Sequence, residues 1–567
     1  MTSYRPLKIR RVSEGIVLDS LSNQNSVLAR IYATRGILTP EELNHSLNKL
    51  APISSLNGVA DAVDLLLKFF DRKITVIGDF DADGATSTAL VLRCLRDYGF
   101  ANVDYLVPNR LEFGYGLTPE IVRVVARRSP ALLITVDNGI SSIAGVSEAR
   151  RLGIPVLITD HHLPGSELPD AAAIVNPNLS DSDFSSKHLA GVGVAFYLMA
   201  ALGQALESGG VKGAAKIAAT YLDLVALGTI ADVATLDYNN RILVSQGLQR
   251  IQAGKAVQGI QSLLKKSGRA LRRTISTDLG FIVGPRLNAA GRIEDMSIGI
   301  ECLLADEPEL AMRYATTLER LNSERRHIET KMRDQAFAYV DAMDNRNLPA
   351  CVCIYDESWH QGIVGLIASR VCERTHHPVI AFARGSGSEL KGSARSIPGV
   401  HIHDLLESIA TIYPDLISKF GGHAMAAGLS LPEKYFSKFS DCASKQVKRL
   451  YPKADFSGTL LIDGTLPPDY INLQFASLLR KSGPWGAGFP EPLWSGIFSI
   501  ISQRVVGGKH LKMRVQPADS SAVLDAIVFN QMVLSLRGPV TLIYRLDVNE
   551  FRSIEIPQLI VEQIMPC

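Results

Sequence analysis

Three short apolar runs between residues 70 and 160 constrain the fold more than any other feature of the chain. The runs ITVIG (74–78), ALLITV (131–136) and VLIT (156–159) are rich in β-branched residues and apolar throughout, which is typical of strands buried on both faces. Amphipathic stretches with helical spacing lie between them. This alternation predicts βαβ units, and therefore an α/β domain with a parallel sheet and right-handed crossovers.

Acidic and histidine residues directly follow each of these runs. In chain order they are Asp79, Asp81, Asp83, Asp137, Asp160, His161 and His162. Ligands of open parallel sheets bind outside the carboxyl ends of the strands, so we expect these side chains to meet there. Carboxylates with one or two imidazoles suit Mn²⁺ or Mg²⁺. An aspartate that bridged two such ions, for which Asp137 is the candidate, would give a two-metal site for attack on phosphorus.

The segment Asp79–Gly84 also fits the first six positions of an EF-hand loop. Two features argue against that interpretation. The twelfth position is Leu90 rather than Glu, and the segment follows a predicted strand rather than a helix. We therefore interpret the acids as part of a site at the end of the sheet.

A further acidic pair, Asp223 and Asp232, stands nine residues apart in an apolar segment. Nine residues are two and a half helical turns, so a straight helix cannot bring both side chains to one site. We expect a break at Gly228-Thr229, Asp232 as a metal ligand beyond it, and Asp223 as a cap or supporting residue.

The chain has 567 residues, too many for one hydrophobic core. Net charge is only +2, so attraction to nucleic acid must come from local patches. Either DNA binding or a solvated surface explains the two basic patches, which are Lys265, Lys266, Arg269, Arg272 and Arg273, and Arg325, Arg326, Lys331 and Arg333. Scattered cysteines without CxxC spacing, no h-region and no run of 18 apolar residues predict a cytoplasmic protein with reduced thiols, neither exported nor membrane-spanning.

The rest of the chain predicts four further parts beside the catalytic domain. Residues 308–343 have the spacing of one long helix that connects two lobes, and the last 110 or so residues read as short strands of a small barrel, such as the oligonucleotide-binding type. The expected parts are a helical segment (1–50), a catalytic domain (51–300), a connector helix (301–345), a smaller α/β domain (346–450) and an OB-like barrel (451–567).

The motifs of this chain resemble those of the DHH phosphoesterase superfamily. GDFDADGATSTAL, VDNGI, TDHH and GTIADVATL are similar to its four motifs in order, and KGSARS (391–396) with GGHAMAAG (421–428) resembles its DHHA1 domain. From about residue 50 onward, the chain is similar to the bacterial single-strand-specific exonucleases of that superfamily. The resemblance implies a cytoplasmic bacterial 5′→3′ exonuclease that releases 5′-mononucleotides from single-stranded DNA with Mn²⁺ or Mg²⁺, in DNA repair and recombination.

The resemblance also implies roles for particular residues. The implied metal ligands are Asp81, Asp83, Asp137, His161 and Asp232, with Asp79 and His162 in or beside that set. His162 could instead hold a scissile-phosphate oxygen or protonate the leaving group. Arg110, Arg286, Ser393, Arg395 and His423 are candidates for binding DNA phosphates.

Two other functions fit parts of the sequence. A DHH phosphodiesterase or pyrophosphatase for small substrates shares the metal motifs, but it needs neither a terminal barrel nor basic patches. A non-catalytic DNA-binding scaffold is disfavoured because no acidic position is lost. We expect single-stranded DNA as the partner, a monomer, and a single-strand-binding protein and a helicase as further partners.

Overall fold

The described part of the chain forms two compact units. The computed structural model describes residues 6–10, 25–108, 116–343, 348–385, 387–531, 538–551 and 554–567. The first unit joins Met1–Glu319 to Leu461–Cys567, and the second is Arg320–Leu460. The first unit is therefore discontinuous in sequence: the chain leaves it within a long helix and returns to it for the final strands.

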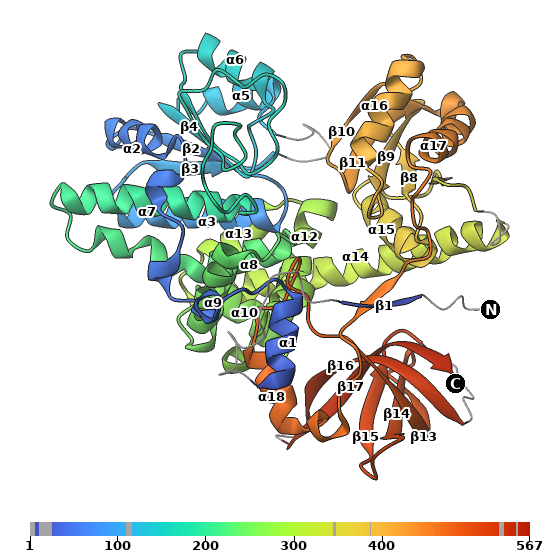
Figure 1. Ribbon diagram of the computed structural model, residues 1–567. Coiled ribbons are helices and arrows are strands. Elements are labelled where there is room, and N and C mark those ends of the chain that lie inside the picture. The colour runs from blue at the N-terminus through green and yellow to red at the C-terminus, as the bar shows by residue number, and fades with distance from the viewer. Residues whose placement is uncertain are drawn as a thin grey trace. The chain divides into compact units, whose positions relative to one another are not determined.

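The first unit contains a five-stranded parallel sheet, of which β2, β3 and β4 are labelled in Figure 1. The three predicted strands are the wholly buried β2, β4 and β5, which are neighbours in the order β3-β2-β4-β5-β6, so this prediction is confirmed. The sequence does not reveal the edge strands, because β3 is only half-buried and β6 has three residues. The strands are β2 (Ile74–Ile77), β3 (Val103–Leu106), β4 (Leu132–Val136), β5 (Val156–Thr159) and β6 (Ala173–Val175).

Helices cover both faces of this sheet. Helices α5 and α6 pack on one face through a core that includes Ile121 and Val146, while α3 and α7 contact the strands from the other side. A further layer of helices packs against α3 and α7. The helices are α2 (Val59–Lys68), α3 (Ala82–Asp97), α5 (Pro119–Ala126), α6 (Ile143–Arg151), α7 (Gly191–Ser208), α8 (Leu222–Ala231), α9 (Tyr238–Gln252), α10 (Gln258–Lys266), α11 (Ser276–Asp278), α12 (Gly284–Ile293) and α13 (Ser297–Leu304).

One helical stretch of the described residues, Ala214–Ala231, is long and apolar enough to cross a membrane. Its mean hydropathy is 1.4, and 56% of it is buried inside the protein. A bent pair, Leu47–Ser55 with Val59–Lys68, passes the same test only as a span broken by 82°. The core helices of soluble proteins also pass, and the last part of the first stretch, α8, packs against α3, α7 and α9.

The long helix α14 (Pro308–Ala342) matches the prediction for residues 308–343, and the boundary between the units falls within it. The second unit contains a sheet of order β10-β11-β9-β8-β7, in which only β7 and β8 are parallel. Its elements are β7 (Val352–Tyr355), α15 (Val364–Thr375), β8 (Val379–Arg384), β9 (Glu389–Arg395), α16 (Ile402–Ile412), β10 (Lys419–Gly422), β11 (Ala426–Pro432) and α17 (Phe436–Leu450).

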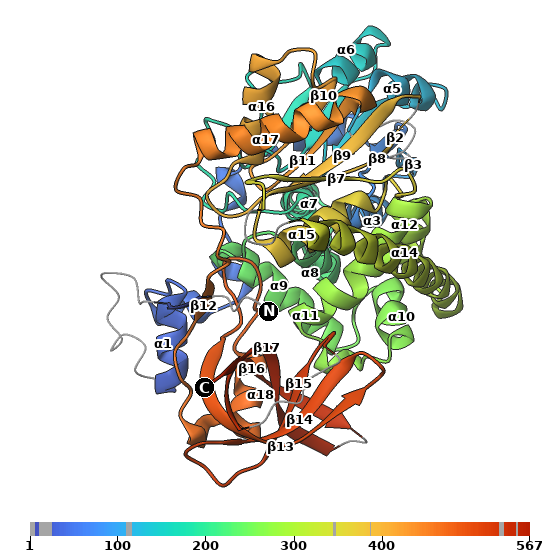
Figure 2. The same ribbon diagram turned by 90° about the vertical axis from the view of Figure 1, so that its right-hand side faces the viewer.

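The final strands of the first unit close into a barrel of order β13-β14-β15-β17-β16, which confirms the predicted small barrel (Figure 2). Helix α18 packs on it, and α1 lies beside α18, because Tyr32 of α1 donates a hydrogen bond to the carbonyl of Ser482. These elements are β1 (Leu7–Ile9), α1 (Ser26–Thr34), β12 (Leu460–Ile462), α18 (Leu473–Lys481), β13 (Trp494–Val506), β14 (His510–Pro517), β15 (Leu524–Val528), β16 (Pro539–Phe551) and β17 (Ile554–Pro566).

Ion pairs join the barrel to the catalytic part of the same unit. Arg273 contacts both Glu550 and Glu555 of the barrel, the second at 3.2 Å. All seven cysteines are free thiols, and six of them are buried, as the sequence predicts.

Candidate metal centre

The carboxyl ends of β2, β4 and β5 bring all the predicted ligand residues together. Three overlapping groups of side chains each have ligand atoms within 4.8 Å of one another. The groups are Asp79, Asp81 and Asp137; Asp83, His161 and Asp232; and Asp137, His161 and His162. Because Asp137 and His161 each belong to two groups, the side chains form one continuous cluster rather than three separate sites.

The alternate spacing of the acids after β2 suggests that all of them lie in one loop, but the structure differs. Asp81 is the N-cap of α3 and accepts a hydrogen bond from the Gly84 N–H at 3.0 Å, so Asp83 lies in the first turn of that helix. A cap formed in this way satisfies an N–H group that would otherwise lack a partner. Asp79, two residues before this cap, accepts a hydrogen bond from the backbone N–H of Phe80.

Asp83 is held by the N-terminus of α7, an interaction that the sequence did not predict. Its carboxylate accepts hydrogen bonds from Gly191 N–H at 2.7 Å and Val192 N–H at 2.9 Å. These amides and the helix dipole stabilise the carboxylate charge. The small residues at the start of the segment AGVGVAF are the only sequence signal of this contact.

Asp137 lies where the chain turns sharply after β4. Its φ is +62°, in the left-handed region that few residues other than glycine adopt, and its side chain is 2% exposed. His161 Nε2 lies 3.1 Å from Asp137 Oδ1. A Cβ atom on Gly191 would lie 2.5 Å from that same oxygen, so glycine is required for α7 to approach this closely.

Asp160 orients the two histidines that follow it. It accepts hydrogen bonds from the backbone N–H groups of Ile140, His161 and His162, and it lies 2.6 Å from His162 Nδ1. The backbone carbonyls of the histidines accept hydrogen bonds from Asn176 and Asn178. Asp160 therefore supports the two histidines, a role that we did not predict from its position in the sequence.

Asp232 follows α8 directly, but the predicted break at Gly228-Thr229 is wrong. Helix α8 continues through both residues to Ala231. Gly228 is present for packing, because a Cβ there would lie 2.3 Å from Thr86 Oγ1 and 2.8 Å from Asp83 Oδ1. In the first turn of α8, Asp223 accepts a hydrogen bond from Val257 N–H, just before α10, so it supports the packing of two helices and does not cap α8.

Burial shifts the acid–base behaviour of this cluster. Burial, together with the charge of Asp81, raises the pKa of Asp83 to about 7. Burial and the neighbouring carboxylates also raise the pKa values of Asp137 and Asp232. These neighbouring acids oppose one another's ionisation. Divalent cations would stabilise the ionised cluster, because their charge offsets that repulsion.

His162 shows the opposite balance. Burial alone would lower its pKa, but the hydrogen bond with Asp160 and the charges of Asp160, Asp232 and Asp79 raise it to about 9. The same contact lowers the pKa of Asp160 against the effect of its burial. Without bound cations, His162 is therefore an imidazolium at neutral pH, with Nδ1 held by Asp160.

The candidate phosphate-binding residues lie in both units. Arg286 of α12 is buried, with Nε 2.5 Å from Glu319 Oε2 and Nη1 bonded to the carbonyl of Ile282. In the second unit, Arg395 Nη1 lies 3.3 Å from Ser393 Oγ on β9, and β11 pairs with β9 so that Ala426 faces Arg395. His423 donates its backbone N–H to Ala426 in the turn before β11. Arg110 lies outside the described residues.

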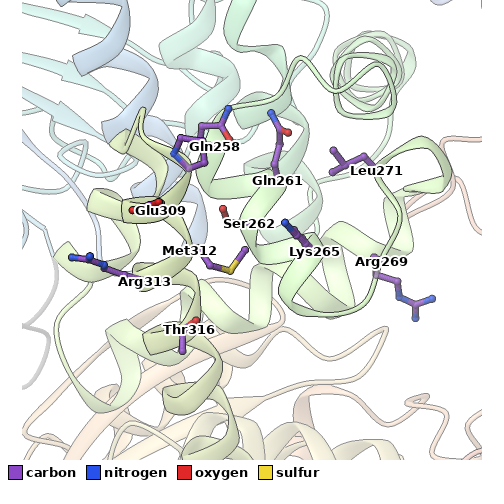
Figure 3. A pocket seen from close by; sticks show the side chains of 11 residues that line it. Gln258, Gln261, Ser262, Lys265, Arg269, Leu271, Glu309, Met312, Arg313 and Thr316 are labelled. Atoms are coloured by element: carbon purple, nitrogen blue, oxygen red, sulfur yellow. The ribbon is translucent and has the colours of Figure 1, made fainter.

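The first basic patch borders a groove in the first unit (Figure 3). The groove has a volume of about 780 Å³ and lies between α10 and the first turns of α14. Its cations are Lys265, Arg269 and Arg313. Arg269 lies 3.4 Å from Asp278, and Arg273, the last residue of the patch, joins the barrel instead of the groove.

The other basic residues serve several purposes. In the second unit Arg325 is buried against Asn322 and Glu329, so it stabilises α14. In the barrel, β13 pairs with β14 and places Arg504 opposite Lys512. Lys512 lies 2.7 Å from Asp525 of β15.

Comparisons with known proteins agree with this architecture. Residues 73–229 match the DHH family N-terminal domain, 347–449 the DHHA1 domain, and 462–563 the RecJ OB domain. The single-stranded-DNA-specific exonuclease RecJ of Salmonella typhimurium is 48% identical over 580 residues, covering 100% of both chains. Thermus thermophilus RecJ in complex with Mn²⁺ gives a TM-score of 0.81 at 29% identity over 99% of this chain and 79% of that one, and its complex with Mg²⁺ gives 0.76 at 27% identity over 99% and 78%.

A parallel sheet with this acidic cluster at its carboxyl edge, followed by a DHHA1 domain, defines a DHH phosphoesterase. The OB barrel and the full-length similarity narrow the class. The chain belongs to the RecJ family.

Proposed function

We propose that this protein is a 5′→3′ exonuclease that removes 5′-mononucleotides from single-stranded DNA and requires Mn²⁺ or Mg²⁺. The observation that carries the proposal is the cluster of buried carboxylates around Asp137 and His161, in a chain similar to RecJ exonucleases over its full length. The 5′→3′ direction, and a role in DNA repair and recombination, rest on that similarity alone.

The donor set fits divalent cations of the Mn²⁺ and Mg²⁺ type. It consists of carboxylate oxygens with imidazole nitrogen and no thiolate, which is the chemistry these ions prefer. Asp79 and Asp81 would hold one ion, Asp83, His161 and Asp232 the other, and Asp137 is placed to bridge them. When bound, such ions supply a water of lowered pKa and neutralise phosphate charge.

His162 acts through its proton in this proposal. An imidazolium cannot bind a metal ion, but it can donate a hydrogen bond to a phosphate oxygen or a proton to the leaving oxygen. The ring is oriented for one such task by Asp160, which holds Nδ1. Because Asp160 holds Nδ1, Nε2 is the atom that would face the phosphate in this assignment.

Basic and small residues outside the cluster would hold the rest of the strand. Arg286, kept in place by Glu319, and the Ser393, Arg395 and His423 group are assigned to backbone phosphates, where they position DNA without reading its sequence. Arg110 is assigned the same role from the sequence. A monomeric state and cooperation with a single-strand-binding protein and a helicase stay predictions.

The test is Asp137→Ala with 5′-labelled single-stranded and blunt duplex DNA in Mn²⁺. We expect turnover to fall by roughly a factor of 1000 or more, because the bridging carboxylate is lost. Single-strand binding, measured by fluorescence anisotropy, should stay within about twofold, because the barrel and its basic strands are separate from the cluster.

Different results would contradict different parts of the proposal. Near-normal activity in Asp137→Ala would remove the bridging role. If the unaltered protein released no mononucleotide from single strands but cleaved short oligonucleotides or pyrophosphate, it would be a small-substrate phosphoesterase. Equal digestion of blunt duplex would contradict the strand preference.

A further inference from the structure

Asp232 lies at the start of a short loop that its own helix holds in part: the N–H groups of Asp232, Val233 and Ala234 donate hydrogen bonds to carbonyls of α8. Asp232 ends α8, and the next residue, Val233, has a φ of +59°, which is strained for a β-branched side chain. The Val233 side chain is 70% exposed, so packing does not fix it. A strained conformation persists only when the surroundings determine it. The hydrogen bonds to α8 reach only as far as Ala234, so Thr235 and Leu236 need support from other segments.

That support comes from residues 485–489, which precede the barrel. The carbonyl of Ala487 accepts a hydrogen bond from Leu236 N–H at 2.8 Å. The two flanking glycines allow this approach: a Cβ on Gly486 would lie 2.7 Å from Leu236 Cδ1, and one on Gly488 2.5 Å from Thr235 Cγ2. We call residues 485–489 the aromatic turn; it covers the loop within three residues of Asp232.

The aromatic turn is itself held firmly. Gly486 and Phe489 exchange backbone hydrogen bonds, and the rings of Trp485 and Phe489 stack with centroids 5.2 Å apart. The guanidinium of Arg241 lies 4.6 Å from the Phe489 ring centroid and also donates a hydrogen bond to the carbonyl of Leu236. Tyr32 of α1 stacks against both aromatic rings.

The turn also contacts a second segment, which leads toward the metal centre. Ser276 Oγ donates a hydrogen bond to the carbonyl of Trp485 at 2.6 Å. Ser276 leads into a π-helical turn, Leu279–Val283, and then into α12. The α12 residue Asn288 accepts a hydrogen bond from Ala82 N–H, between two of the acids. One turn thus contacts both the loop after Asp232 and the segment that leads into α12.

We propose that the aromatic turn Trp485–Phe489 positions Asp232 for metal binding. The segment that enters the OB barrel would thereby set part of the geometry of the metal centre. The inference rests on the proposed function, because it takes Asp232 as a metal ligand. The residues of the turn contact neither metal nor DNA in this assignment; they are positioning residues that act through the backbone of residues 233–236.

The test is Gly488→Ala, with Gly254→Ala as its matched control. Both glycines have a φ of +70°, so alanine is equally strained at either position, but a Cβ on Gly254 meets nothing within 4 Å. Gly254 follows the far end of α9 and lies in no part of the site. We expect Gly488→Ala to weaken Mn²⁺ binding, measured by electron paramagnetic resonance, about tenfold, as losses of supporting contacts do, and Gly254→Ala to leave it unchanged.

A rescue variant separates positioning from general damage. Thr235→Ser removes the Cγ2 methyl that the new Cβ would meet, so Gly488→Ala combined with Thr235→Ser should regain Mn²⁺ affinity within about threefold of the unaltered protein. Single-strand binding in EDTA should be the same in all variants, because the barrel is intact. Phe489→Leu, which adds no bulk but loses the aromatic stack, should weaken Mn²⁺ binding without the clash.

The inference is overturned if Gly488→Ala binds Mn²⁺ as Gly254→Ala does, or if Thr235→Ser restores nothing. Should Gly488→Ala not fold, normal Mn²⁺ affinity in Phe489→Leu overturns it. Failure of the proposed function has a separate signature: the unaltered protein would then release no mononucleotide from single-stranded DNA.

Discussion

Asp83 shows how one residue can be both stabilised and opposed by its surroundings. Two backbone N–H groups of α7 donate to its carboxylate, which favours the charge. Its complete burial and the neighbouring Asp81 oppose the charge more strongly, and its pKa rises to about 7. In the proposed metal site, we expect Asp83 to release this proton near neutral pH when a metal ion binds.

The stability of the metal-free protein should therefore fall as pH rises between about 4 and 7. Across that window the folded protein keeps a proton on Asp83 that the unfolded chain, with an ordinary pKa of 3.8, has lost. Mn²⁺ should consequently raise the melting temperature more at pH 8 than at pH 6. Calorimetry in EDTA and in Mn²⁺ measures both effects.

Asp83→Asn is the control for this titration, because the amide has nearly the same shape as the carboxyl group and has no proton to lose in this pH range. Its melting temperature in EDTA should depend less on pH than that of the unaltered protein. Equal slopes for the two proteins would show that Asp83 does not carry the proton.

At the scale of elements, the N-terminus of α7 fixes the geometry between two ligands. Gly191 donates to Asp83 and makes room for Asp137, so one residue sets the separation of two acids from different strand ends. Such positioning matters because catalysis is sensitive to misplacements of about 1 Å.

We predict that Gly191→Ala lowers turnover roughly 100-fold and also lowers the melting temperature, because the new Cβ would lie 2.6 Å from the Cβ of buried Asp137 and displace that residue. Gly193→Ala, in the next position but one, should stay within about threefold, since its Cβ meets only the end of the Leu189 side chain at 3.0 Å. Release of mononucleotides and thermal unfolding measure the two effects. Equal activity in both variants would contradict the prediction.

The sequence predicts the ligands of this centre better than it predicts their support. The buried strands can be predicted because they are apolar runs. Acids directly after parallel strands meet at one edge of the sheet, so Asp81, Asp137 and His161 could be predicted to lie together. The contacts of Asp83 with α7, and of Ala82 with Asn288, join segments more than a hundred residues apart and leave no local pattern. Gly228 was misleading, because glycine marks close packing as well as a helix end.

At the scale of the whole molecule, positive charge is concentrated in patches, while the net charge is small. A net charge of +2 gives little general attraction to DNA, so the groove with Lys265 and Arg313 is a place where a phosphate backbone would find concentrated positive charge. Several other basic residues are occupied: Arg273 binds barrel glutamates and Arg325 is buried. The sequence patches therefore overstate the surface that DNA could use.

Replacing both Lys265 and Arg313 by Gln should weaken single-strand binding and lower the slope of log affinity against log salt by about 0.7 for each lost phosphate contact. Titrations over a range of NaCl concentrations measure that slope. The matched control is Lys212→Gln with Lys216→Gln, two exposed lysines of the same unit away from the groove. An unchanged slope in the groove variant would exclude the groove from the DNA path.

The discontinuity of the first unit has a consequence for the order in which the protein becomes complete. Every acid and histidine of the metal cluster is synthesised before Pro308, yet the turn that contacts the Asp232 loop lies beyond the whole of the second unit. A chain whose synthesis stops anywhere between Pro308 and the aromatic turn contains all the proposed ligands but lacks the contact at Leu236. Translation must therefore pass through the DHHA1 domain before the catalytic domain can adopt the structure described.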